Sequence, residues 1–431
     1  MGFQTGLSGL NASSKNLDVI GHNVANSATV GFKASQAQFA DVFAASLSGG
    51  GGAQVGIGTR LASVAQQFTQ GNISATNNPL DMAINGRGFF RLSDNGAISY
   101  TRNGQFQLDK DNNIVTSSGI NLTGYQADSA GTVTGALGNI QLNTADIDPS
   151  ITNTISIGAN LDSRMTAPTA PLVAGTLTGV APNFNAPNPA SYNSSTSLSV
   201  YDSLGNSHIA TFYFVKAPAP AANTWDVLMT VDNGVNDGGE IRTVTSLVFD
   251  ATGKLTAPAG PPLGYVPSAA TNDIAWPAAM GVTTPQLLNY DFAGSTQFGS
   301  SFGVNALSQD GFTSGRMAGF SIGSDGTVQG RYTNGQTRTL GQVALANFAN
   351  PQGLQQMGDN QWTESSSSGA AVVGAPGTAS LGVLQASSTE DSNTDLTAEL
   401  VNMIVAQRAY QANAQTIKTQ DAIQQTLMNL R

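Results

Sequence analysis

The chain contains no cysteine, only two histidines and little charge: 10% of its 431 residues are Asp, Glu, Lys or Arg. The absence of cysteine excludes a disulfide framework, a thiolate nucleophile and a cysteine-type zinc site. With 27 acidic and 17 basic residues, the formal net charge is -10. The chain therefore lacks the basic excess that binds nucleic acid. So few charges leave little repulsion between copies, which favours self-association.

Long apolar runs are also missing. No segment approaches the 18 uninterrupted apolar residues that indicate a membrane span, so we expect no membrane insertion. The first residues contain neither a basic region nor the apolar run of a cleaved secretory signal. The sequence therefore predicts a protein that stays in the cytoplasm or is exported without a cleaved signal.

Motifs that carry chemistry are incomplete. The glycine run 49–52 is not followed by the Gly-Lys-Ser/Thr of a phosphate-binding loop. Asp109, Asp111 and Asn113 begin like a calcium loop, but the required glycine and glutamate do not follow, so we interpret this stretch as a hairpin turn. Two histidines leave little room for a Ser-His triad. We predict that the protein is not an enzyme and needs no cofactor or metal.

A helix is predicted near each end of the chain, because apolar residues recur there at 3-4 spacing. Isolated helices are marginal in water, so each of these helices needs a partner. That partner is either the other terminal helix of the same chain or the helices of other copies, and the scarcity of charge favours the second alternative. The two stripes consist of Phe3, Leu7, Leu10, Leu17 and Val24 at the start, and of Leu396, Leu400, Met403, Tyr410 and Ile417 at the end.

The middle of the chain alternates short strands with turn signals such as Asn103-Gly104, which predicts a mainly β fold with α-helical termini. The hairpin pattern near residue 100 returns at 320–340, which suggests one β domain built from both flanks around an inserted β domain. Loops 166–189, 257–277 and 365–380 indicate no function. The expected organisation is terminal helices at 1–30 and 390–431, connecting loops at 31–71 and 366–389, a β domain at 72–146 and 292–365, and an inserted outer β domain at 147–291.

Both ends carry specific motifs. The stretch "GLNASSKNLDVIGHNVANSATVGFKAS" resembles the N-terminal signature of the bacterial flagellar rod and hook family of axial proteins, and "ELVNMIVAQRAYQANAQ" is similar to that family's C-terminal helix. "VYDSLGNSHIATFYFVK" resembles a strand pair of the inserted domain in hook members, whereas rod members are shorter. His22 departs from the family, in which Asn is usual there. The matching motif residues are Asn23, Ala25, Asn26, Thr29, Gly31, Phe32 and Lys33.

The resemblance implies an architecture and a role. The terminal helices of many copies would pack as concentric coiled coils into an inner tube around an export channel. The polymer would be a hollow, flexible tube, a universal joint that transmits torque from the rod to the filament. In this arrangement the segment 23–31 would end the first helix and turn the chain outward, with Gly31 at positive φ and Phe32 as an apolar anchor.

The resemblance also implies partners and a location. The partners would be other copies of the chain, the distal rod, hook cap and hook-filament junction proteins, and the flagellar type III export apparatus. The protein would lie outside the cell in the flagellar hook, near the basal body, without a cleaved signal peptide. Phe39 and Phe43 in "FADVF" resemble the segment recognised at the export gate. Alternatively, these two aromatic residues pack on the wall of the tube.

Other functions stay open at this point. Within the family, the alternative is a distal rod or hook-filament junction protein. From another class, the alternative is a secreted β-rich surface-layer or adhesin subunit, and an enzyme is the third. Electron microscopy of the purified protein would separate tubes from sheets.

Overall fold

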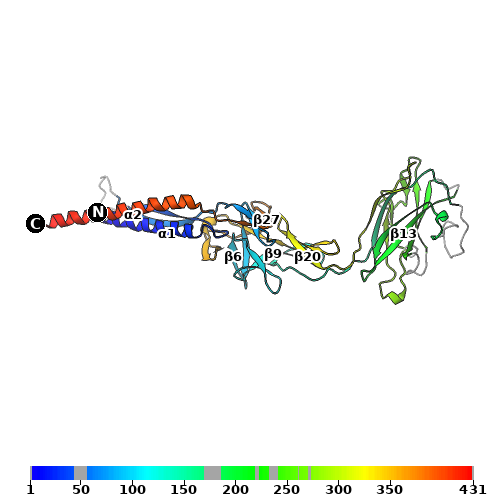
Figure 1. Cartoon of the computed structure of the whole chain (residues 1–431), viewed down its shortest axis with the longest axis horizontal. Coiled ribbons are helices and arrows are strands. Elements are labelled where there is room, and N and C mark those ends of the chain that lie inside the picture. The colour runs from blue at the N-terminus through cyan, green and yellow to red at the C-terminus, as the bar shows by residue number, and fades with distance from the viewer. Residues whose placement is uncertain are drawn as a thin grey trace. The chain divides into compact units, whose positions relative to one another are not determined.

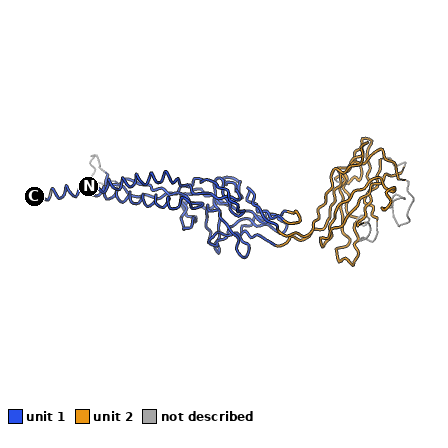
Figure 2. Tube along the Cα trace, viewed as in Figure 1, with its two compact units in different colours: residues 1–144, 318–331, 337–431 blue, residues 145–317, 332–336 orange. Residues whose placement is uncertain are grey.

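The structure is a computed structural model in which strands predominate and an α-helix lies towards each end of the described chain (Figure 1). The chain divides into two compact units (Figure 2). Unit 1 comprises residues 1–144, 318–331 and 337–431, and unit 2 comprises residues 145–317 and 332–336. The structure describes residues 2–42, 56–168, 186–218, 223–232, 241–260, 262–269 and 273–429.

The boundary of the insert differs from the expected one. Residues 292–317, which we expected in the first β domain, belong to unit 2, and the unit begins at residue 145 rather than 147. The reason is strand pairing: β19 (Gly303–Gln309) lies antiparallel to β11 (Thr154–Asn160) and extends its sheet. The composition shift in the sequence marks a Pro-rich loop and not this last strand.

The helices α1 (Gly2–Ala25) and α2 (Leu396–Asn429) form an antiparallel pair within the chain. Gly6 faces Ile417 near the termini, and at the other end Asn23 Nδ2 donates to Glu399 Oε1 at 3.1 Å. The first alternative therefore holds within one chain, and pairing with the helices of other copies stays a prediction. Figure 1 shows both termini at the same end of the pair, with the last turns of α2 running beyond α1. In the described residues, neither helix combines the length and apolarity that a membrane span requires.

The expected connecting loops contain strands. Within 31–71, β1 (Ser35–Val42) and β2 (Gly58–Gln66) pair antiparallel, and the amide of Thr59 donates to Ser8 Oγ of α1 at 3.3 Å. Within 366–389 lie short strands that pair with partners far away in the sequence. Such three- and four-residue strands are too short to show the alternation by which a strand is predicted. They are β26 (Val372–Gly374) on β23 (Leu345–Asn347), β27 (Val383–Ala386) on β4 (Met82–Asn85), and β28 (Ser388–Glu390) on β3 (Ile73–Ala75).

The rest of unit 1 is one large antiparallel sheet. Strands from both flanks meet in it, because β22 pairs with β9, and its core includes the buried Phe90, Leu92 and Leu345. Its strands among the described residues are β5 (Phe89–Asp94), β6 (Ala97–Thr101), β7 (Phe106–Leu108), β8 (Ile114–Thr116), β9 (Asn121–Ala127), β10 (Val133–Asn139), β20 (Met317–Ile322), β21 (Thr327–Tyr332), β22 (Thr337–Val343), β23 (Leu345–Asn347), β24 (Gln355–Gly358), β25 (Gln361–Thr363) and β26.

Unit 2 packs two sheets on a shared core. Phe212, Trp225 and Tyr290 are fully buried between them. One sheet has the order β17 (Tyr265–Val266), β18 (Asn289–Asp291), β11, β19. The other has the order β12 (Ser194–Tyr201), β13 (Ser207–Lys216), β14 (Thr224–Val231), β15 (Arg242–Phe249), β16 (Leu255–Ala257).

One turn type recurs in both units. In each case an aspartate accepts hydrogen bonds from the backbone amides two and four residues further on, and the residue in between has positive φ, which favours Gly or Asn. The stretch that begins like a calcium loop is such a hairpin turn, and no metal-ligating cluster occurs among the described residues. These turns span 109–113, 128–132, 202–206 and 250–254.

Candidate functional site

Helix α1 carries two neighbouring stripes. The stripe that faces α2 consists of small and polar residues: an added Cβ on Gly9 would lie 2.7 Å from Asn413 Oδ1, and Asn413 Nδ2 donates to Ser13 Oγ at 3.4 Å. Ile20 and Asn23 continue this stripe and are buried. The predicted apolar stripe lies one residue further along, about 100° around the helix. In it Phe3 and Leu7 are exposed, and the half-buried members are Leu10, Leu17 and Val24.

Helix α2 repeats this arrangement. Its contact stripe runs through Glu399, Ala406 and Asn413, of which Ala406 is buried. The predicted seam lies beside it and only partly meets α1. Met403 and Ile417 are half-buried, whereas Leu396, Leu400 and Tyr410 are exposed.

The two apolar stripes point to the same side of the pair. Each is offset by one residue from the contact stripe, in the same screw sense, and the helices run in opposite directions. The two rotations therefore bring both stripes to one side. The exposed fractions there are 46% for Phe3, 44% for Leu7, 46% for Leu396 and 45% for Leu400. We call these ten stripe residues the apolar face.

The other side of the pair is covered by the β1–β2 hairpin. A groove of about 780 Å³ separates them, lined by Val19, Phe39 and Val405 among others. Phe39, from the expected export-gate segment, is 39% exposed in β1, and Phe43 lies outside the described residues. Between Leu400 and Val405, α2 exposes apolar side chains in several directions. A helix that is apolar all round is typically buried in its native setting.

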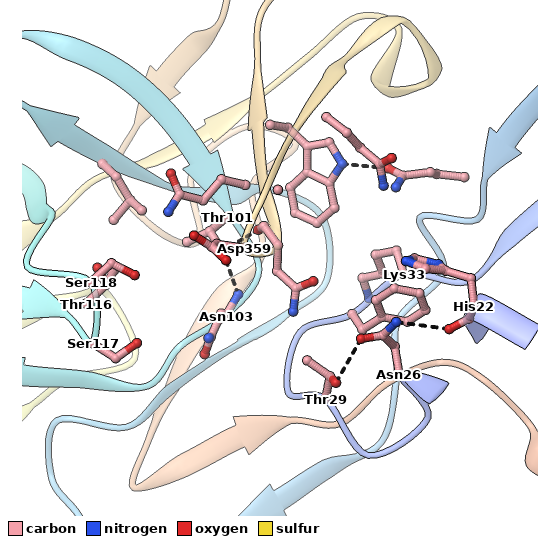
Figure 3. A pocket seen from close by; sticks show the side chains of 18 residues that line it. His22, Asn26, Thr29, Lys33, Thr101, Asn103, Thr116, Ser117, Ser118 and Asp359 are labelled. Carbon is pink, nitrogen blue, oxygen red and sulfur yellow. Dashed lines mark hydrogen bonds between the residues drawn. The ribbon is translucent and has the colours of Figure 1, made fainter. Parts of the chain in front are cut away.

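The motif after α1 turns the chain into the β strands. Ala25 is the last helical residue, and Asn26 Nδ2 donates to the carbonyl of His22 at 3.0 Å. Thr29 Oγ1 donates to Asn26 Oδ1 at 3.2 Å, as Figure 3 shows. Gly31 has the predicted positive φ, +72°, and a Cβ there would lie 2.5 Å from the amide nitrogen of Asn103. Only glycine fits this position without displacing backbone.

Two buried or half-buried asparagines fasten the helix ends to the strands. Asn23 exchanges two hydrogen bonds with the backbone of Ser35, at 2.8 and 2.9 Å. Asn393, just before α2, accepts from the amide of Ala34 at 2.7 Å and donates to the carbonyl of Gln67 at 2.6 Å. The two chain ends are therefore tied to the same stretch of β1 and β2.

A buried charge cluster lies beneath this junction. Glu390 Oε1 accepts from Lys33 Nζ at 2.6 Å and from the amide of Gly71 at 2.9 Å, while Glu390 Oε2 accepts from Arg102 Nη1 at 2.9 Å. The side chains are 0% exposed for Glu390, 1% for Lys33 and 5% for Arg102. Phe32, the residue before Lys33, is also buried. We call Lys33, Arg102 and Glu390 the neck cluster.

Burial sets the electrostatics of this cluster. It lowers the pKa of Lys33 below its ordinary value, against the Glu390 carboxylate, which raises it. Arg102 responds in the same way, and its pKa is also lowered by burial. Removing one partner of a buried ion pair typically costs about 3–5 kcal/mol, because a buried charge is left uncompensated.

Sequence reasoning missed the neck cluster. In the sequence, Glu390 stands with Asp391, Asp395 and Glu399 near the start of the C-terminal helix, where acidic residues are favoured. In the structure only Asp395 of these four caps α2, accepting from the amides of Thr397 at 2.9 Å and Ala398 at 3.2 Å. The available signal was Lys33, a motif lysine that follows Gly-Phe and has no acidic residue near it in the sequence.

An open cavity of about 440 Å³ lies beside the motif (Figure 3). His22, Asn26 and Thr29 of the helix end line one part, and residues 116–118, 356 and 358–362 line others. The His22 ring lies 5.4 Å from that of Phe32. The cavity lining consists mostly of amides and hydroxyls, which can hydrogen-bond to another polypeptide but include no arrangement of a nucleophile with a base.

Family models match the chain along most of its length. They are the flagella basal body rod protein over residues 3–33, the flagellar hook protein FlgE/F/G D1 domain over 83–160, the flagellar basal body protein FlaE D2 domain over 160–312, and the flagellar basal body rod FlgEFG protein C-terminal segment over 385–430.

Individual proteins match over their full lengths. The chain is 44% identical to the flagellar hook protein FlgE of Escherichia coli (strain K12) over 444 residues, covering 100% of both chains. It is 40% identical to that of Salmonella typhimurium, again over 100% of both chains. With that of Borreliella burgdorferi the identity is 32%, over 99% of this chain and 98% of the relative.

A solved structure shares the fold. The crystal structure of Helicobacter pylori flagellar hook protein FlgE2 superimposes with a TM-score of 0.51 at 14% identity, covering 72% of this chain and 99% of that one. The full-length identities, rather than this distant structure, decide the family. The chain belongs to the flagellar hook protein FlgE family, and it is a structural subunit of the flagellar hook and not an enzyme.

Proposed function

We propose that copies of this chain assemble through the apolar face of the helix pair into a hollow, bendable tube. The observation that carries the proposal is that both apolar stripes lie on one side of the pair and that five of their ten residues are exposed within the single chain. Apolar side chains that gather on one exposed face mark an interaction site. The tube would act as a universal joint that transmits torque from the rod to the filament, with the helices as its inner coiled-coil layer.

The energetics support assembly through this face. Burying one Leu or Ile side chain contributes roughly 1.5–3 kcal/mol. Several such side chains per subunit would become buried, and the apolar stretch from Leu400 to Val405 offers surface to more than one neighbour. Within each copy, α1 and α2 can approach closely because their contact stripe contains Gly6 and Gly9. Small, weakly charged contact surfaces would also let neighbouring copies slide as the tube bends.

We further propose the partners and location that this role requires. The tube would end on distal rod, hook cap and hook-filament junction proteins and would lie outside the cell. The chain would leave through the flagellar type III apparatus without a cleaved signal. Phe39 and Phe43 are candidates for recognition at the export gate. Phe39 lies in a strand that is paired with β2, so the export gate could bind it as an extended peptide only while the chain is unfolded.

The alternatives receive less support. A rod or junction protein is disfavoured, because the full-length relatives named above are hook proteins. A surface-layer subunit or an enzyme is disfavoured for the same reason.

Electron microscopy and sedimentation of the purified protein test the proposal. We expect tubes of uniform diameter that pellet, in equilibrium with monomer. Flat sheets would contradict the proposal, as would a protein that stays monomeric at all concentrations and salt conditions.

A further inference from the structure

We propose that Glu390 is a positioning residue whose charge holds the two ends of the chain together, so that the assembly-competent form of unit 1 depends on the neck cluster. This inference rests on the proposed assembly. The side chains of the cluster are buried within the chain, so its effect would pass through the placement of the helix pair on the β strands.

The contacts of the neck cluster join two distant parts of the chain. Lys33 and Arg102 come from the first quarter of the chain, and Glu390 lies 357 and 288 residues away from them. Glu390 is the carboxylate with which both cations form ion pairs among the described residues. Two buried cations therefore depend on one residue close to the other end of the chain.

Other hydrogen bonds join the same two parts of the chain. The backbone carbonyl of Glu390 accepts from the amide of Gly31 at 2.7 Å. Its neighbour Asp391 accepts from Ser74 Oγ at 2.5 Å. Gly31 lies in the turn that follows α1. The position of Glu390 therefore fixes the point at which the chain passes from α1 to the β strands.

Unit 2 does not depend on Glu390. The strands from β11 to β19 pair with one another in its two sheets, and its core side chains come from residues 155–292. Loss of the charge on Glu390 should therefore loosen the backbone around the neck cluster in unit 1 and leave unit 2 unchanged. This difference within one molecule makes the proposal testable.

The decisive variant is Glu390→Gln in the full chain. Glutamine keeps the size of the side chain but removes its charge and places an NH₂ group against two cationic donors. Glu364→Gln is the matched control, because Glu364 is exposed in the same unit. Lys33→Met/Glu390→Gln is the second test, because it leaves one uncompensated cation, Arg102, instead of two.

Backbone hydrogen exchange and tube yield are the two measurements. In Glu390→Gln we expect protection at residues 31–35, 69–75 and 386–391 to fall by about tenfold or more, as local opening becomes easier. Tube yield should fall with it, and protection in β12–β15 should stay at the parental level. The double variant should regain part of the lost protection, and Glu364→Gln should match the parent.

Two results would overturn the proposal. One is a Glu390→Gln protein with parental neck protection. The other is a double variant that is less protected than Glu390→Gln, which would assign the role to hydrogen bonding and shape rather than to charge. Failure of the assembly proposal looks different: the parent and Glu364→Gln would then form no tubes, whatever the exchange data show.

Discussion

The two compact units bury their apolar residues to different degrees. In unit 2, side chains such as Phe212, Trp225 and Tyr290 are fully enclosed between two sheets. In unit 1 the helix pair leaves Phe3 and Leu400 nearly half exposed. A helix pair has too little partner surface to enclose all its apolar positions, whereas a two-sheet sandwich can. Surface for association therefore remains where the fold ends in two helices.

The two units also differ in net charge. The residues of unit 2 include twelve acidic and five basic side chains, and those of unit 1 include fifteen and twelve. Unit 2 thus has a formal net charge of -7 and unit 1 of -3. Near-neutral surfaces associate more readily, and net charge keeps a surface soluble. This contrast supports contact between copies through unit 1 and solvent exposure of unit 2.

The largest expected effect comes from placing a charge on the apolar face. Leu400→Asp should abolish tube formation, because each copy in the polymer would bury an uncompensated carboxylate. It should leave the melting of unit 2 unchanged, because Leu400 belongs to unit 1. Sedimentation and electron microscopy measure tube formation, and thermal melting measures the stability of unit 2.

Val401→Asp is the control for this change. Val401 is 56% exposed but lies off the apolar face, so its effect on assembly should be milder. Tubes formed by Leu400→Asp would show that another surface drives assembly. A much lower melting temperature of unit 2 would show that the units are coupled in a way that we do not expect.

The converse change removes a core side chain from unit 2. Trp225→Ala should lower the stability of unit 2 by about 3–5 kcal/mol, the usual cost of emptying such a site. Trp225 is fully buried, whereas Ile209 in the same sheet is 56% exposed, so Ile209→Ala is the control. Calorimetry should show the shift in one transition only, with tubes still forming below it. Loss of tubes at temperatures at which unit 2 is folded would contradict the division of roles.

A pair of glycine substitutions sharpens the comparison within unit 1. Gly31→Ala should destabilise the neck by at least about 1–2 kcal/mol, because non-glycine residues disfavour its positive φ and the added Cβ would meet the backbone of Asn103. Gly21→Ala, with open space around it in α1, should be neutral or stabilising by up to about 1 kcal/mol. Urea unfolding followed at unit 1 measures both, and equal effects would refute the close-approach argument.

Particular residues show how far the sequence predicts this structure. The 3-4 spacing placed both helices and their apolar stripes, and the local motif predicted the positive φ of Gly31. Spacing did not reveal which stripe meets the partner helix, because the contact residues Gly6, Gly9 and Asn413 carry no hydrophobic signal. The role of Glu390 was missed for a related reason. A nearby helix start offered a local explanation, whereas its partner Lys33 lies 357 residues away.

The smallest expected effect concerns acid, in unit 2. Arg164 donates Nε and Nη2 to the two carboxylate oxygens of Asp162, at 2.9 and 2.8 Å, and its side chain holds the pKa of Asp162 at about 2, below the ordinary 3.8. A lowered folded-state pKa stabilises the fold above the unfolded value, and this contribution is lost as pH falls from 3.8 towards about 2. Asp162→Asn should therefore melt slightly below the parent at neutral pH, and the two curves should converge in that window. Thermal melting of unit 2 across a pH series measures this, with Asp148→Asn, at an exposed carboxylate elsewhere, as control. Parallel curves down to the lowest pH would show that the Asp162–Arg164 pair contributes nothing to the acid response.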